Sequence, residues 1–193
     1  MPDFNVTGQI GLDPITQIGD NVMTQGLGFP LRPVSTSPGE GVGMTSVLVS
    51  QHNGSQVPTG LGVPMQVAFG APESNEYVSI DAAGTITFIQ AGAYMALCNV
   101  YFDRSTDQGE SLTFLRFLAD GVQAGNPVTI EMDSAGTSQF QQFVLAGQVP
   151  AGTELSVEIM RDSGGYNDGF LVSFTSSDGW GTAPSAIIRV MKF

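Results

Sequence analysis

The chain has 193 residues, and its 18 acidic against 6 basic side chains give a formal net charge of -12. This charge repels phosphate backbones and anionic membrane surfaces, so neither nucleic acid nor a membrane is expected as a direct partner. Only 12% of the residues are charged and 25 are glycine, a composition that suits proteins with broad contact surfaces in large assemblies.

The N-terminal 44 residues carry isolated apolar side chains with no period of 2 or 3.6 residues. Pro and Gly between residues 29 and 41 favour extended backbone, which cannot build a core alone. We therefore expect residues 1–44 to form an extended arm that orders on a partner, or else a disordered leader. No secretory signal pattern opens the sequence. The side chains expected to dock the arm are Ile10, Ile15, Ile18, Leu27 and Phe29.

From about Met65 to Phe193 apolar and polar residues alternate, and Gly, Pro, Asp or Asn interrupt the pattern at short intervals. Such alternation predicts antiparallel strands with one buried face, packed as a sandwich or barrel. No long segment predicts a helix. Residues 45–193 are thus expected to form one all-β domain. Its strands are predicted over residues 46–50, 65–69, 77–80, 85–89, 93–102, 112–119, 128–132, 139–145, 154–161, 171–175 and 186–191.

Two of these strands are apolar on both faces, one over residues 94–102 and the other over residues 187–193. A strand that is buried on one face only does not need this pattern. The second face is therefore expected to meet a neighbouring subunit, or else to be covered by the N-terminal extension, and we favour self-association. The interface is expected to include Tyr94, Val100, Ile188 and Val190.

The sequence offers no constellation for catalysis and implies no cofactor. His52 is the only histidine and Cys98 the only cysteine, so a His-based triad and a His/Cys metal site are not expected. Cys98 falls within a strand and is expected to pack as a small apolar side chain. Oxygen ligands in two loops could hold calcium, although solvated loop acids are the commoner case. These are Asp103, Asp107 and Glu110 in one loop, and Asp162, Asn167 and Asp168 in the other.

Two further features could contribute to carbohydrate chemistry, a pair of glutamates and a loop tryptophan. Glu154 and Glu158 lie four residues apart on one strand face, too far to share a proton, so a two-carboxylate glycosidase is a remote option. Trp180 lies in a Gly-rich loop, where it could serve as a platform for a sugar ring, with Tyr166 as a second contact. The alternative for Trp180 is a loop aromatic that packs over the edge of the core.

The segment Ala91-Gly92-Ala93-Tyr94, between two predicted strands, resembles the hallmark step of the jelly rolls of the complement globular head and tumour necrosis factor type. Residues 149–159 and 185–190 are similar to later strands of that family, the second to its final strand. The resemblance covers residues 47–193. It implies an antiparallel jelly-roll sandwich and a tight homotrimer, with the Tyr-bearing and last strands near the threefold axis.

Within that family, residues 112–123 and the Gly- and Thr-rich composition of the chain look most like jelly rolls of tailed-phage virion proteins. The chain has no Gly-X-Y stalk, unlike the collagen-like relatives. The resemblance implies a trimeric head decoration (cement) protein on the capsid surface, whose arm binds the major capsid protein. The alternative is a receptor-binding fibre or lectin-like tip that recognises a host surface glycan. Neither role is enzymatic.

Overall fold

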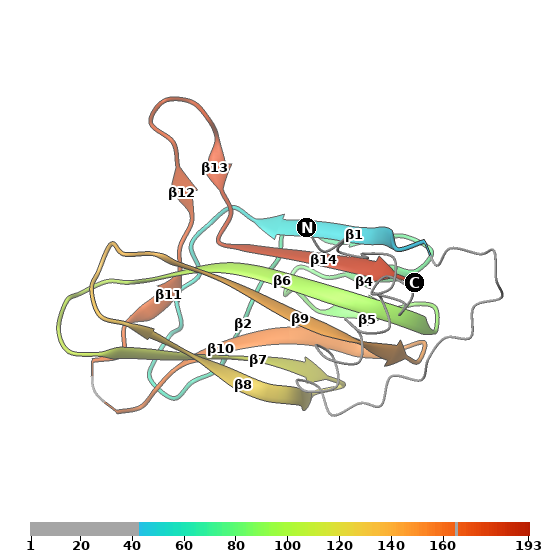
Figure 1. Cartoon of the computed structure of the whole chain (residues 1–193), viewed down its shortest axis with the longest axis horizontal. Coiled ribbons are helices and arrows are strands. Elements are labelled where there is room, and N and C mark those ends of the chain that lie inside the picture. The colour runs from blue at the N-terminus through green and yellow to red at the C-terminus, as the bar shows by residue number, and fades with distance from the viewer. Residues whose placement is uncertain (1–42, 165) are drawn as a thin grey trace, which may run out of the picture. The chain divides into compact units, whose positions relative to one another are not determined.

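A computed structural model describes residues 43–164 and 166–193, and Met44–Phe193 form one compact unit. All the regular secondary structure of the described residues is β-strand (Figure 1). None of these residues forms a helix that could cross a membrane. The strands are β1 (Thr45–His52), β2 (Met65–Gln66), β3 (Glu73–Ser74), β4 (Val78–Ile80), β5 (Ile86–Phe88), β6 (Gly92–Arg104), β7 (Ser111–Ala119), β8 (Val122–Met132), β9 (Gln139–Val149), β10 (Glu154–Arg161), β11 (Gly169–Leu171), β12 (Phe174–Thr175), β13 (Thr182–Ala183) and β14 (Ala186–Lys192).

The strands of the sandwich form two antiparallel sheets. One has the order β1-β14-β6-β9, with β11 also paired to β6, and the other has the order β3-β4-β5-β10-β7-β8, with β2 also paired to β10. The jelly-roll pattern is seen when the eight strands β1, β5, β6, β7, β8, β9, β10 and β14 are counted from one to eight in chain order. The first sheet then holds strands one (β1), eight (β14), three (β6) and six (β9), in this order across the sheet. The second sheet holds the second, seventh, fourth and fifth. This exchange between sheets is the jelly-roll arrangement, so the predicted all-β jelly-roll fold is confirmed.

The core lies between the two sheets, and β6 and β14 supply much of it. Tyr94, Val100, Ile188 and Val190 are between 0% and 2% exposed within a single chain. Their expected place at a subunit interface was therefore wrong, because they already pack inside the sandwich. When both faces of a strand are apolar, a period of 2 does not tell which face turns inward. Cys98 is fully buried among them, as predicted, and burial raises the pKa of its thiol.

The Asp120-Gly121 pair closes a hairpin between β7 and β8. Both residues have positive φ, 50° at Asp120 and 75° at Gly121, as a two-residue hairpin loop of type I′ requires. The Asp120 carboxylate also accepts a hydrogen bond of 2.8 Å from the backbone N–H of Glu154, and this contact ties the turn to β10.

β8 begins at Val122, six residues earlier than the sequence predicts. Gly125, Asn126 and Pro127 lie within it, where the register with β7 shifts between Leu115 and Phe117. Proline cannot donate to a ladder, but β8 is the edge strand of its sheet, where a missing donor and a bulge are tolerated. The two-residue strands β3 and β13 were not predicted either.

The expected arm, residues 1–44, lies outside the described residues except for its last two. The docking roles of its five apolar side chains therefore stay predictions. They are Ile10, Ile15, Ile18, Leu27 and Phe29.

Candidate functional site

The outer face of the β1-β14-β6-β9 sheet carries many apolar side chains, and a polar pair lies among them, in which the Gln142 amide donates a hydrogen bond of 2.9 Å to the Asn99 side-chain oxygen. Leu97 on β6 pairs with Val144 on one side and Arg189 on the other, and Arg189 pairs in turn with Val49. Val49 is 50% exposed and Val144 is 41% exposed. This open sheet face is made by Val49, Met95, Leu97, Tyr101, Phe140, Val144, Ile187 and Met191, with Arg189 and the Asn99–Gln142 pair among them.

The open sheet face differs in charge from the rest of the chain. Of its four strands, only β6 contains an acidic residue, Asp103, which lies near the end of that strand. Arg189 makes no ion pair with any described residue. Two copies of a chain with net charge -12 repel each other, but a face without carboxylates lets them approach. Exposed apolar side chains that gather on one face of a sheet mark an interaction site.

One corner of the open sheet face is aromatic. Tyr101 on β6 and Phe140 on β9 are paired across the ladder, with ring centroids 5.1 Å apart and ring planes inclined by 50°. Phe140 is 50% exposed although it makes this contact. Large exposed rings at the edge of an apolar face are typical anchors of protein interfaces.

Sequence reasoning identified two of the four strands of the open sheet face, β6 and β14, but not the residues that point outward. The side chains that point outward are the odd-numbered ones of β6, such as Met95 and Leu97, and not the even-numbered ones. Phe140 and Val144 on β9 were not among the expected contacts. Their signal was weak, because glutamines flank Phe140, and Val144 lies in a run of four apolar residues (143–146) that does not tell which face turns outward.

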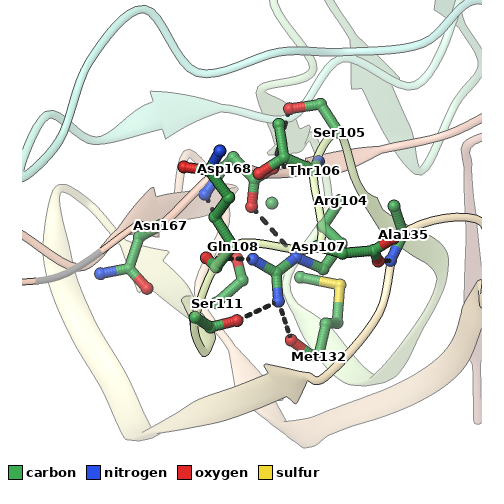
Figure 2. Close-up of polar contacts among 12 residues, drawn as sticks. Arg104, Ser105, Thr106, Asp107, Gln108, Ser111, Met132, Ala135, Asn167 and Asp168 are labelled. Carbon is green, nitrogen blue, oxygen red and sulfur yellow. Dashed lines mark hydrogen bonds and ion pairs between the residues drawn. The ribbon is translucent and has the colours of Figure 1, made fainter.

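A second site, which is polar, lies where the loops that follow β6, β8 and β10 meet (Figure 2). The Arg104 side chain is completely buried there. Its Nη1 donates to the carbonyl oxygens of Gly109 at 2.6 Å and Met132 at 2.8 Å, and its Nη2 donates to that of Gln108 at 2.9 Å. Its Nε lies 3.2 Å from Oδ1 of Asp168, an ion pair without the alignment of a hydrogen bond.

Asp168 completes this Arg104 cluster. Its carboxylate accepts hydrogen bonds from the Ser105 hydroxyl at 2.9 Å and from the Thr106 backbone N–H at 2.5 Å. Burial raises the pKa of Asp168, but these hydrogen bonds and the charge of Arg104 outweigh burial, so its pKa lies below the ordinary value. The carboxylate is therefore held ionised at neutral pH.

The loop residues that were considered for calcium, apart from the exposed Glu110, accept hydrogen bonds from donors of the protein. Asp103 accepts from the backbone N–H of Gly136 at 3.0 Å and from the Ser138 hydroxyl at 3.2 Å. Asp107 accepts from the backbone N–H of Ala135. Among the residues described, no three His, Cys, Asp or Glu side chains are grouped to hold a metal ion. The arrangement fastens loops to one another.

The remaining candidates for chemistry lie apart from one another. His52 ends β1, where its carbonyl oxygen accepts from the Ser185 backbone N–H at 2.8 Å. Glu158 accepts two hydrogen bonds from the Arg116 guanidinium, at 2.7 and 2.9 Å. Glu154, on the same strand, is exposed. Glu158 is therefore committed to a cross-strand ion pair.

The two aromatic residues considered for glycan contact are not brought together. Trp180 lies in the turn of the β12-β13 hairpin and is 91% exposed, whereas Tyr166 lies in the loop between β10 and β11 beside Gly109. The hairpin extends away from the two sheets, and the β10-β11 loop lies at another side of the sandwich (Figure 1). Among the described residues, a site at Trp180 is therefore built by the hairpin.

No family model matches the sequence, and no curated protein matches it. Among solved structures, the chain is similar to murine APRIL, with 13% identity and a TM-score of 0.46 over 77% of this chain and 98% of that one. It is also similar to Eiger TNF from S. frugiperda, with 13% identity and a TM-score of 0.38 over 76% of this chain and 92% of that one. At this identity the likeness concerns the fold alone, and the jelly-roll assignment rests on the strand order.

Proposed function

We propose that this protein is a structural protein of a tailed-phage virion, a decoration (cement) protein that acts as a homotrimer on the capsid surface. The observation that carries the proposal is the open sheet face. Its apolar side chains gain free energy when another copy removes them from water, at about 25 cal/mol per Å² of apolar surface. The number of three copies and the virion context come from the resemblance of the sequence.

The proposed mechanism is mass action. A protein that binds the assembled capsid lattice but not its dissociated subunits stabilises the lattice. In the proposal, residues 1–44 of each copy bind the major capsid protein, and the open sheet face holds the copies together. Three arms on one trimer raise the effective concentration of each arm for its site, so weak individual contacts give firm attachment.

Two measurements test this function. Multi-angle light scattering of the intact chain at micromolar concentration is expected to give the mass of three chains, and co-sedimentation with undecorated phage capsids is expected to pellet the protein. A single-chain mass contradicts the trimer. Turnover of a capsule or cell-wall glycan that Glu154→Gln or Glu158→Gln abolishes contradicts a purely structural role.

A further inference from the structure

The β12-β13 hairpin is a separate two-stranded sheet that pairs with neither sheet of the sandwich. Its turn is nevertheless well defined. The Ser176 backbone N–H donates to the Gly181 carbonyl at 2.9 Å, and the Asp178 N–H donates to the Ser176 hydroxyl at 3.1 Å. The hydroxyls of Thr175 and Thr182 lie 3.0 Å apart across the strands. A turn held by these contacts presents its side chains in one geometry before a partner arrives.

Trp180 is the most exposed large apolar side chain of the described residues, at 91%. Gly179 and Gly181 flank it, both with positive φ, and a Cβ atom at either glycine would meet no other atom within 4 Å. The space beside the indole is therefore open. Tryptophan is highly buried on average, so an indole held in water on a projecting turn calls for a ligand that covers it.

We infer that the β12-β13 hairpin is a binding site for a neutral carbohydrate chain, with the Trp180 indole as the surface on which a sugar ring lies. The C–H face of a sugar packs on an aromatic ring, while the hydroxyls around that face need hydrogen-bond partners. The hairpin carries side chains of this kind within five residues of Trp180 in the sequence. They are Thr175, Ser176, Ser177, Asp178 and Thr182.

The surroundings of Trp180 favour a sugar over an apolar protein pocket. The other exposed aromatic of the hairpin is Phe174, in the strand β12 at its base, and hydroxyl-bearing residues and Asp178 separate it from Trp180 in the sequence. The core of a protein–protein interface consists of adjoining apolar side chains. A single indole among hydroxyls instead suits a ligand with one apolar face and a polar rim.

Charge determines the class of carbohydrate. Residues 172–185 contain no Lys or Arg, and Asp178 lies two residues before Trp180. A sialylated, sulfated or phosphorylated chain would find no cation here and would be repelled by Asp178 and by the net charge of -12. A neutral chain has no such penalty. The site does not depend on the decoration role, because it would serve a decoration protein and a receptor-binding tip equally.

The test uses Trp180 itself, because it is the only tryptophan of the chain and its fluorescence reports on this site alone. The full-length protein is titrated with maltohexaose, cellohexaose, laminarihexaose and chitohexaose, and with polysialic acid as the anionic counterpart. We expect the free protein to emit as a water-exposed indole. At least one neutral chain is expected to shift the emission to shorter wavelength in a saturable way, and polysialic acid is expected to cause no shift.

Variants are measured by calorimetry with the neutral chain that binds. Trp180→Ala is expected to weaken binding about tenfold or more, and Trp180→Phe less, because a phenyl ring still offers a stacking face. Phe174→Ala is the matched control and is expected to leave the affinity unchanged. The inference is overturned if none of the four neutral chains gives a saturable shift, or if only polysialic acid does. It is also overturned if the free protein already emits as a buried indole, because another copy then covers Trp180.

Discussion

Leu97 on β6 pairs directly with Arg189 on β14, so the one charged side chain of the open sheet face lies beside an apolar residue near its centre. An arginine in this position need not hinder association, because its long apolar stem covers surface while the guanidinium reaches for acceptors. A carboxylate in the same place has no such stem and adds to the negative charge of the chain. The pair therefore offers a way to switch association off without disturbing the core.

Leu97→Asp is expected to give a folded single chain. The new carboxylate lies on the outer face, next to Arg189, and its burial between two copies would cost several kcal/mol. Val190→Asp is the contrasting variant, because Val190 is 0% exposed and a charge there is expected to unfold the sandwich. Light scattering gives the mass, and circular dichroism during heating gives the stability. A Leu97→Asp protein with the same mass as the wild type would show that the copies meet elsewhere.

Gly84→Ala is expected to destabilise the protein strongly. Gly84 has a φ of 93°, and a Cβ atom there would lie 2.1 Å from the carbonyl oxygen of Val67. Gly121→Ala is the matched control, because Gly121 also has a positive φ, 75°, but open space around it. The control is expected to cost about 1 kcal/mol from backbone strain alone. Urea unfolding measures both variants, and equal losses would mean that the loop at Gly84 moves aside freely.

Asp168→Asn is expected to lower stability by about 3 kcal/mol, because it leaves the buried guanidinium of Arg104 without its anion. The folded-state pKa of Asp168 lies below the ordinary value of 3.8, so its contribution is present above that value and is lost as the pH falls through the folded pKa. The wild type should therefore lose stability below about pH 4, and the variant should lose less. Unfolding midpoints between pH 2 and 7 measure this, and parallel curves would refute it.

The alternating pattern was sufficient to predict most strands, because the inward and outward positions of a strand follow from a period of 2. The same period could not assign the faces of β6, since Leu97 and Cys98 are both apolar. The local sequence pattern could not predict the Arg104 cluster either, because Asp168 lies 64 residues from Arg104 in the sequence and only the fold brings the two together. The sequence showed the loop acids one loop at a time and did not show the donors from other loops to which they bind.

Deletion of residues 1–44 is expected to leave a folded trimer that no longer binds capsids. β1 begins at Thr45, so the truncated chain keeps every strand that the structure describes, together with the open sheet face. Ordering an arm on a partner costs about 1 to 2 kcal/mol of backbone entropy per residue, so its apolar side chains must each find a groove. Ile15→Asp is therefore expected to weaken attachment, whereas Gln17→Asp adds the same charge at a polar position and is expected to change it little. Co-sedimentation with undecorated capsids measures both, and a truncated trimer that pellets as well as the full chain would make the jelly roll itself the docking surface.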